Sequence, residues 1–288
     1  MPALKHILFP VDFSDRCDAV RPLVKSVAQR FRSKLTLMHV IQTPVGWYDG
    51  IEAPYPIMFD VPSMLEEGRR QLEAFLEAPT PAGITKVVEQ GDPATQITAY
   101  AKQNDVDLIM MPTHGYGKFR SLLLGSVTAK VLHDARCAVW TAAHTEAEEL
   151  AGGLDCRSMM CAVDLTPESV HLIRYAADLA HEYRAKLRLV HAVSVTEARP
   201  QKYLDTEFNQ FLFQAAREEI AKLQEEARTN LELCLDGGSV STVVRAAALH
   251  HNADLVVIGR GKLQEILGRL RTNAYAIIRD SSCPVLSV

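Results

Sequence analysis

The amino-acid sequence repeats itself once along the chain. Four apolar segments of the first half return in the second half, in the same order and at similar intervals. The pairs are ILFPVDFS (7–14) with MMCAVDLT (159–166), KLTLMHV (34–40) with KLRLVHA (186–192), DLIMMP (107–112) with DLVVIG (254–259), and HDARCAV (133–139) with RDSSCPV (279–285). Because this period far exceeds the roughly 20–50 residues of solenoid repeats, each copy is a whole domain. The repeat predicts two domains of one fold, residues 1–145 and 157–288.

Within each half, short β-branched apolar runs alternate with longer helical patterns, which is typical of βαβ units and a parallel sheet. The runs are apolar almost throughout, as expected of strands covered by helices on both faces. The fold class predicted is therefore α/β, with two tandem doubly wound five-stranded parallel sheets. Strands are expected near 5–11, 34–41, 84–89, 107–112, 136–142, 157–163, 186–193, 231–235, 254–258 and 283–288. Helices are expected near 15–31, 62–78, 93–104, 123–134, 167–184, 205–229, 239–252 and 270–280.

Local signals refine the helix starts and the boundary between the domains. Thr166-Pro167 and Asp92-Pro93 each place a capping side chain before a proline, which favours a helix that begins there. Residues 143–156 are acidic, contain a glycine pair and lack a strand pattern, so they form the expected linker. On the helix 205–229, Phe208, Phe211, Leu212, Ala215 and Ile220 recur at helical spacing, which predicts core packing.

Composition narrows the class of protein. With 288 residues, 48% hydrophobic and 23% charged, the chain is expected to be soluble and globular. A net charge of -4 without a long basic run argues against a nucleic-acid partner. No apolar stretch approaches the roughly 20 residues that cross a bilayer, and the first residues do not resemble a secretory signal. We therefore expect no membrane partner, a cytoplasmic location and reduced thiols for all six cysteines.

The residues that follow the strands carry the functional prediction, because ligands of open parallel sheets bind beyond the carboxyl ends of the strands. The first strand runs into Pro10-Val11-Asp12 and the second into His39-Val40. The fourth runs into Met111-Pro112-Thr113-His114-Gly115-Tyr116-Gly117. That segment leads to Gly125-Ser126-Val127-Thr128 and then to a helix.

This last segment suits a polyphosphate. Gly115 and Gly117 let the backbone approach a ligand closely, and the free N–H groups of a helix that opens at Gly125-Ser126 favour anions. The hydroxyls of Ser126 and Thr128 are further donors, and Ser126 is also a candidate helix cap. A plain strand-to-helix loop with an N-cap explains the same residues equally simply, so both interpretations stay open at this point.

The spacing of Gly115, nine residues, and then Gly125-Ser126 resembles the ATP motif of the universal stress protein family. That motif reads Gly, two residues, Gly, nine residues, Gly, and then Ser or Thr. Residues 10–14 (PVDFS) and 91–94 (GDPA) also resemble this family, and the resemblance covers essentially the whole chain twice. It implies a Rossmann-like fold of the adenine nucleotide alpha hydrolase kind, with ATP bound in some members and absent from others.

The resemblance also implies partners and roles. Members commonly pair through the last strand, which implies that the two halves form a pseudo-dimer and that the chain forms a homodimer. Asp12 with the backbone of Val11 and Val40 would line the adenine and ribose, and Mg²⁺ would be held through the phosphates. The implied binding residues are Pro10, Val11, Asp12, Val40, Met111, His114, Gly115, Gly125, Ser126, Val127 and Thr128. No catalytic or metal-ligating residue is predicted.

Each half departs from the motif at a different place. Pro112 stands where the first glycine belongs, and proline has no N–H and a fixed φ. The second half has one residue too few between Gly259 and Gly261, and Arg271 replaces the last glycine. A side chain there would fill the phosphate pocket. We therefore expect ATP mainly in the first domain, with a degenerate motif in the second.

Other candidate chemistry has simpler explanations. His39 and His191 occupy matching strand ends, where a hydrogen-bonded structural role is favoured over catalysis. His250-His251 ends a helix, with no carboxylate or cysteine at ligand spacing in the sequence, and is interpreted as a cation favoured by the helix dipole. Residues 42–64, rich in proline and aromatic residues, are a candidate lid or dimer contact.

The functional prediction is a nucleotide-binding stress-response module or switch. P-loop and kinase motifs are missing from the sequence, which favours binding over fast turnover. Two alternatives stay open: a slow ATPase, and a nucleotide-free interaction protein in which both sites are vestigial.

Overall fold

The computed structural model describes residues 4–42, 60–76, 83–113, 124–142, 155–194, 202–260 and 269–288. These residues fall into two compact units, one made of described residues from 4–113 and 125–139, and the other of Leu124 with described residues from 140–288. The predicted domain limits, 1–145 and 157–288, stay predictions. Most of the predicted linker and of the candidate lid, residues 143–154 and 43–59, lies outside the described residues.

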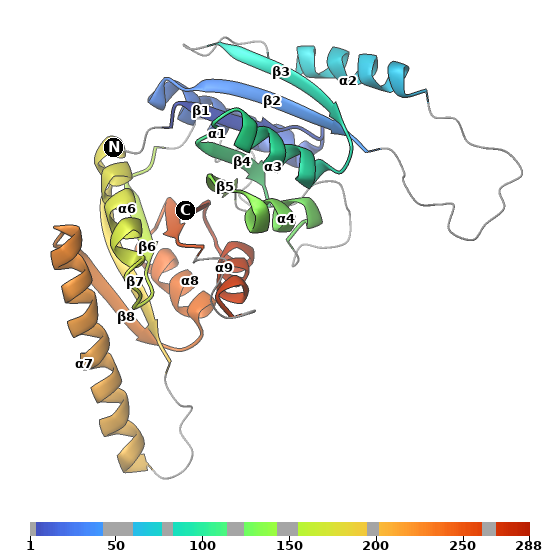
Figure 1. Cartoon of the computed structure of the whole chain (residues 1–288). Coiled ribbons are helices and arrows are strands. Elements are labelled where there is room, and N and C mark those ends of the chain that lie inside the picture. The colour runs from blue at the N-terminus through green and yellow to red at the C-terminus, as the bar shows by residue number, and fades with distance from the viewer. Residues whose placement is uncertain are drawn as a thin grey trace, which may run out of the picture. The chain divides into compact units, whose positions relative to one another are not determined.

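The first half is a parallel sheet in the strand order β3-β2-β1-β4-β5. The order reverses between β1 and β4, which pair directly and place the switch point between them. In Figure 1, α2 and α3 lie on opposite sides of β2 and β3. The elements are β1 (His6–Pro10), α1 (Asp15–Phe31), β2 (Lys34–Ile41), α2 (Val61–Phe75), β3 (Ile84–Gln90), α3 (Pro93–Gln103), β4 (Leu108–Pro112), α4 (Ser126–Asp134) and β5 (Ala138–Ala142).

The second half repeats this topology in the order β8-β7-β6-β9-β10, with its switch point between β6 and β9. Helices α6 and α7 pack together, α8 packs on α9, and β7 and β8 lie between α7 and α8 (Figure 1). The predicted fold class is therefore confirmed. The elements are β6 (Ser158–Ala162), α6 (Ser169–Tyr183), β7 (Lys186–Val193), α7 (Lys202–Ala227), β8 (Glu232–Gly237), α8 (Val240–His250), β9 (Leu255–Ile258), α9 (Arg269–Asp280) and β10 (Val285–Ser287).

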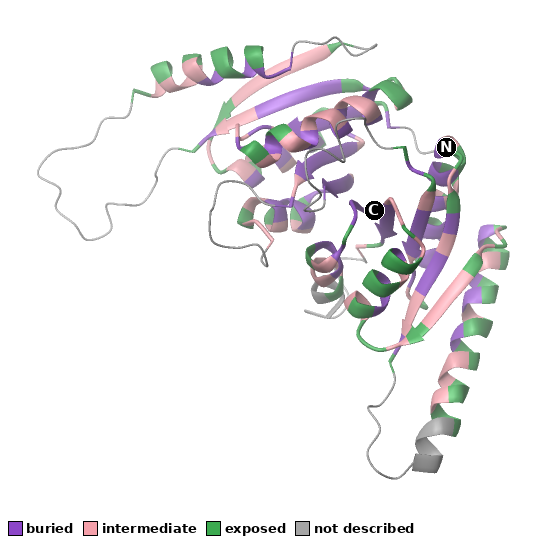
Figure 2. Ribbon diagram, turned by 180° about the vertical axis from the view of Figure 1, so that it is seen from behind, coloured by how far each residue is buried: buried purple, intermediate pink, exposed green. Residues whose placement is uncertain are grey.

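The apolar runs form the cores. Every residue of β9 is buried, and β1 and β4 are buried except for their last residue. Figure 2 shows these central strands as buried and the outer faces of the helices as exposed. Burial of apolar side chains on both faces of the sheet explains why the strands read as continuous apolar runs. None of the helices within the described residues is long and apolar enough to cross a membrane.

A carboxylate fastens the amino end of each sheet. Asp107, directly before β4, accepts hydrogen bonds at its Oδ2 from the backbone N–H groups of Lys5 (2.7 Å) and His6 (2.9 Å). Asp254, directly before β9, accepts the same pair of bonds from residues 157 and 158, at 2.7 and 2.9 Å. Each aspartate thus ties the start of one central strand to the start of its neighbour, at the end opposite the predicted ligand edge.

Two of the predicted helix starts differ in outcome. Asp92 caps α3, accepting a hydrogen bond from the N–H of Thr95 at 2.9 Å, as predicted. The predicted start of α6 at Thr166-Pro167 is wrong, because the helix begins at Ser169. The hydroxyl of Thr166 donates to Asp164 Oδ1 at 2.6 Å, and the N-cap position of α6 is taken by Glu168 without a side-chain cap.

The core packing predicted for α7 holds for only part of that helix. Ile220 is fully buried, but Phe208 is 52% exposed and Phe211 is 65% exposed. These two phenylalanines and Ala215, which is also exposed, follow the outer side of the helix. The prediction was therefore wrong for Phe208, Phe211 and Ala215.

Candidate functional site

Asp12 is held in place directly after β1. Its Oδ1 accepts hydrogen bonds from the backbone N–H of Ser14 (3.0 Å) and from the Ser14 hydroxyl (2.6 Å). The Ser14 oxygen also accepts from the N–H of Cys17 and thereby caps α1. Phe13, between them, has a φ of 58°, a left-handed conformation that is uncommon for a bulky residue and concentrates at functional sites. No pattern in the sequence predicts this conformation.

His39 joins the carboxyl ends of β1 and β2. Its Nδ1 donates to the backbone carbonyl oxygen of Val11 across 2.7 Å, because a carbonyl oxygen only accepts. The N–H of Val11 in turn donates to Met38 O at 2.8 Å, and the Phe13 ring packs against the imidazole with centroids 4.6 Å apart. The structural role predicted for His39 is confirmed, and the backbone of Val40 follows at the same edge.

The beginning of α4 lies beside the end of β4. The N–H of Gly125 donates to Thr113 O at 2.9 Å, and the buried Thr128 hydroxyl donates to Pro112 O at 3.1 Å. Gly125 occupies the N-cap position, and no side chain caps the helix. The cap predicted for Ser126 is therefore wrong, since Ser126 is the first residue of the helix and is exposed.

The structure places nine of the predicted binding residues at the carboxyl edge of one sheet. They come from the end of β1, the end of β2, the end of β4 and the start of α4, on the two sides of the switch point. His114 and Gly115 lie outside the described residues, and Met111 is buried in β4. The nine are Pro10, Val11, Asp12, Val40, Met111, Gly125, Ser126, Val127 and Thr128.

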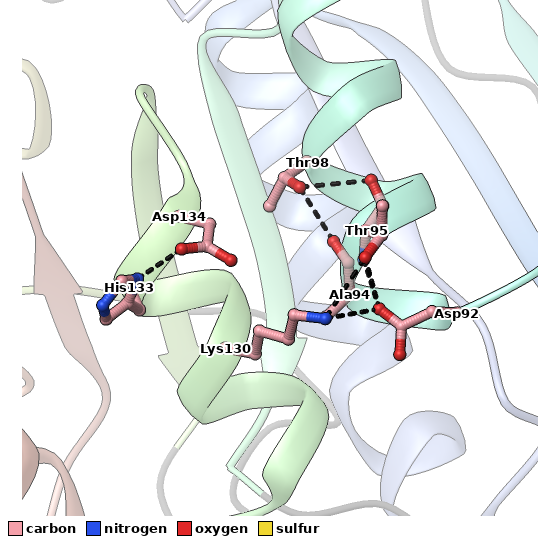
Figure 3. Close-up of polar contacts among 7 residues, drawn as sticks. All are labelled: Asp92, Ala94, Thr95, Thr98, Lys130, His133 and Asp134. Carbon is pink, nitrogen blue, oxygen red and sulfur yellow. Dashed lines mark hydrogen bonds and ion pairs between the residues drawn. The ribbon is translucent and has the colours of Figure 1, made fainter.

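A polar cluster that the sequence did not reveal joins α3 to α4 (Figure 3). Lys130 Nζ lies 2.8 Å from Asp92 Oδ1 and donates to the hydroxyl oxygen of Thr95 at 3.2 Å. The hydrogen bond from Lys130, followed by those from Thr95, lowers the pKa of Asp92 to about 2. Because Lys130 lies on α4, whose N-cap is Gly125, this cluster fixes the position of the candidate site's helix.

The second domain has its own cavity, of about 210 Å³, at the carboxyl ends of β6, β7 and β9. Asp164 repeats the position of Asp12, and its Oδ1 accepts from Thr166 Oγ1 at 2.6 Å and from Ser169 Oγ at 2.7 Å. His191 Nδ1 donates to Val163 O at 2.8 Å, which confirms its predicted structural role. The arrangement after the first two strands is thus nearly the same in both halves.

The structure also gives His251 a cysteine partner that sequence spacing did not reveal. Cys234 Sγ lies 3.3 Å from His251 Nε2, where β8 meets the end of α8. Burial raises the pKa of the Cys234 thiol and lowers the pKa of the His251 imidazole, so both groups favour their neutral forms. The interpretation of His251 as a cation at the helix end is therefore not supported.

Comparison with known proteins agrees with this geometry. The family model described as "Universal stress protein family" matches residues 3–142 and 156–288. A Thermus aquaticus universal stress protein is 31% identical over 142 residues, which is 47% of this chain and 96% of the relative. Universal stress protein A homolog 1 of Coxiella burnetii is 30% identical over 141 residues, which is 47% of this chain and 96% of that protein.

Solved structures extend the likeness to both halves. The crystal structure of a universal stress protein from Archaeoglobus fulgidus covers 100% of this chain, and this chain covers 97% of it. The TM-score is 0.65 at 20% sequence identity, which shows a shared fold. Since the family model matches each half separately, the chain belongs to the universal stress protein family as a tandem two-domain member.

Proposed function

We propose that this chain is a nucleotide-binding stress-response protein that holds ATP mainly in its first domain and acts as a binding module or switch. The start of α4 carries the proposal. It lies next to the end of β4 at the switch point, with a glycine at the N-cap position and no capping side chain among the described residues. Free N–H groups at a helix start favour a phosphate both by hydrogen bonding and through the helix dipole.

The residues around this helix start suit the phosphates, ribose and adenine of ATP. Gly125 presents no Cβ to an approaching phosphate, and the exposed Ser126 has a hydroxyl free of any capping role. Asp12, fixed by Ser14, and the backbone after β1 and β2 would bind the adenine and ribose. The Mg²⁺ of Mg·ATP would be held through the phosphates. Bound ATP would supply negative charge at the helix start, which these amide donors would neutralise.

Pro112 keeps a direct contact between the end of β4 and α4. The Thr128 hydroxyl donates to the carbonyl oxygen of Pro112. The contact between α4 and the end of β4 therefore does not need the N–H that proline lacks. The nucleotide-free alternative, which Pro112 favours and the intact Gly125-Ser126 opposes, stays open. A slow ATPase stays an open alternative, which phosphate release from purified protein with Mg²⁺ would reveal.

The test compares the unaltered chain with Gly125→Arg and Gly125→Ala. We expect ATP at about one per chain among small molecules released from undialysed protein, and its loss in Gly125→Arg, whose side chain would occupy the phosphate position. Gly125→Ala is the matched control, because Gly125 has a φ of −59° and alanine adopts that angle without strain. Absence of ATP from the unaltered chain, together with no binding on titration, would support the nucleotide-free alternative.

The switch needs a separate test. Binding of ATP is expected to change hydrogen exchange in residues 42–64 and in the last strand of each domain. Unchanged exchange in both would leave a binding module without a switch. The homodimer and the cytoplasmic location stay predictions, and sedimentation of the purified chain tests the first of them.

A further inference from the structure

Phe13 separates Asp12 from Ser14 just after β1, in a left-handed conformation with a φ of 58°. Any residue with a Cβ is disfavoured there, because its Cβ lies too close to the following carbonyl oxygen. Such a conformation persists only where the surrounding structure enforces it. The same turn brings the N–H of Ser14 to 3.0 Å from Asp12 Oδ1, so the conformation of Phe13 bears directly on the position of the Asp12 carboxylate.

Two rings hold the side chain of Phe13. Its ring centroid lies 4.6 Å from that of His39 in a tilted arrangement, and 5.9 Å from that of Phe75 in an edge-to-face arrangement. Both distances are in the range that aromatic pairs prefer. His39 is itself fixed by its bond to Val11 O, and Phe75 also packs against a second ring, that of Phe9, at 6.1 Å. These contacts are the structure that enforces the turn.

The contacts of Phe75 connect α2 to this turn, because Phe75 is the last residue of that helix. Arg21 of α1 donates to Phe75 O at 2.8 Å, and its guanidinium lies 5.1 Å from the centroid of the Phe75 ring. Further back along α2, a Cβ added to Gly68 would meet Cδ2 of His39 at 3.2 Å, closer than packed side chains ordinarily come. Helix α2 therefore supplies one of the two rings and packs against the other.

The second domain differs at this place. Leu165 stands at the position of Phe13, but it has no left-handed φ and is 40% exposed. Arg174 donates to Glu226 O, so the end of α7 is fastened to α6 much as α2 is fastened to α1. However, α7 ends at Ala227, which has no ring. Among the described residues, both domains thus have the helix link, whereas the aromatic contacts and the left-handed turn belong to the first.

We propose that Phe13 is a positioning residue for the nucleotide site of the first domain. Its left-handed backbone, enforced by the rings of His39 and Phe75, sets Asp12 in the orientation that binds the ligand. The end of α2 acts on the site through Phe13. The identity of the ligand rests on the proposed function, whereas the positioning of Asp12 rests on the contacts of Phe13.

The experiment compares two variants that both remove the ring but differ in the backbone. Glycine adopts a left-handed φ freely, whereas alanine does not. In calorimetric titrations of the full-length chain, we expect Phe13→Ala to weaken ATP binding by roughly tenfold, and Phe13→Gly to keep it within roughly threefold of the unaltered chain. Equal ATP affinities in the alanine and glycine variants overturn the proposal, because a role in packing alone predicts the same loss from both.

Further variants keep the comparison decisive if one of that pair does not fold. Phe13→Asn replaces the glycine variant, because asparagine also tolerates the left-handed conformation, and Phe13→Leu replaces the alanine variant. Leu165→Ala and Leu165→Gly are the matched controls in the second domain. Both should bind ATP as the unaltered chain does, since no left-handed turn is present at Leu165.

A double variant tests the part played by α2. Phe75→Leu removes the ring that contacts Phe13 but keeps an apolar side chain, and should weaken ATP binding by roughly three- to tenfold. In the Phe13→Gly chain, the same change should alter ATP affinity by less than roughly twofold, because the ring that Phe75 holds is gone. Equal losses in the two backgrounds would contradict the action of α2 through Phe13.

Amide exchange separates this proposal from the proposed function. The N–H of Ser14 donates to Asp12 Oδ1, so its exchange rate, measured by NMR and corrected for the intrinsic rate of each sequence, reports the turn without any ligand. Exchange should be faster in Phe13→Ala than in Phe13→Gly, and equal or reversed rates overturn the proposal. If the unaltered chain binds no ATP while this order holds, the proposed function fails and the positioning of Asp12 by Phe13 stands.

Discussion

His39 donates a hydrogen bond of 2.7 Å from Nδ1 to the backbone carbonyl oxygen of Val11, and this bond joins the ends of two neighbouring strands. His191 makes the same bond to Val163 at 2.8 Å in the second domain. A histidine in each half therefore serves to hold the backbone that precedes an aspartate, Asp12 or Asp164, in a fixed position. Its second ring nitrogen is left for other contacts.

We expect His39→Leu to destabilise the first domain by about 1–3 kcal/mol, because the carbonyl oxygen of Val11 loses its partner in a partly buried place. ATP affinity should fall as well, since the backbone next to Asp12 is no longer held. Thermal unfolding and ATP titration measure the two effects. His191→Leu is the matched control, and it should lower stability without changing ATP affinity. An equal loss of ATP affinity in both variants would contradict the assignment of ATP to the first domain.

Thr128 provides a second test, because its hydroxyl is the polar link between α4 and the end of β4. Thr128→Val keeps the shape but removes the bond to Pro112 O, and should cost about 1 kcal/mol of stability. Thr128→Ser keeps the hydroxyl and should retain ATP affinity, whereas the valine variant should bind ATP several-fold more weakly. Equal affinities in the two variants would show that this hydroxyl does not position the phosphate site.

Because of the ion pair between Asp92 and Lys130, we expect the free energy of unfolding to depend on pH. The folded-state pKa of Asp92 is lowered to about 2 from an ordinary value of 3.8, so its carboxylate stabilises the fold above pH 3.8. That contribution is lost as the pH falls from about 4 towards 2. Since both side chains are about half exposed, the ion pair is worth no more than about 1 kcal/mol.

The measurement compares the free energy of unfolding of the unaltered chain with that of Lys130→Met at several pH values. The difference between them should be present at pH 5 and shrink towards pH 2. Asp92→Ala should cost about 1 kcal/mol more than the ion pair alone, because Asp92 also caps α3. A difference that stays constant from pH 5 to pH 2 would show that the pair contributes nothing.

The outer side of α7 gives a prediction about packing. Phe208→Ser and Phe211→Ser should each change stability by less than about 1 kcal/mol, because both rings are more than half exposed. Ile220→Ala, on the buried side of the same helix, should cost about 2–5 kcal/mol. Chemical denaturation measures all three. A large loss from either phenylalanine variant would mean that the ring is covered in solution.

The alternation of strands and helices could be predicted because buried parallel strands must be apolar on both faces, and the runs at 7–11 and 108–111 show this directly. The start of α6 could not, because residues 166–168 form turns closed by the backbone bonds Ser169 N to Thr166 O and Val170 N to Pro167 O, and the helix begins only at Ser169. Asp92-Pro93 and Thr166-Pro167 are the same kind of local signal, but only the side chain of Asp92 accepts a hydrogen bond from an N–H group of the helix that follows. The outcome depends on which neighbour competes for the side chain.

The residues of the candidate site also differ in whether the sequence could predict their positions. Asp12 and Gly125 could be placed at one edge, because all parallel strands present their carboxyl ends together. The contact of Lys130 with Asp92, and that of Cys234 with His251, join residues whose proximity depends on how helices pack, which no local pattern encodes. The exposure of Phe211 likewise depends on which side of α7 meets the sheet.

The bonds that Asp107 and Asp254 accept give each domain a mechanical polarity. A pair of charge-assisted hydrogen bonds fastens the two central strands at their amino ends, and no equivalent carboxylate joins the described carboxyl ends. The fastened end holds the central strands in register, and the opposite end carries the loops and helix starts that a ligand would contact. Any movement that a ligand causes would therefore begin where the ligand binds and be transmitted outward through the helices that start there.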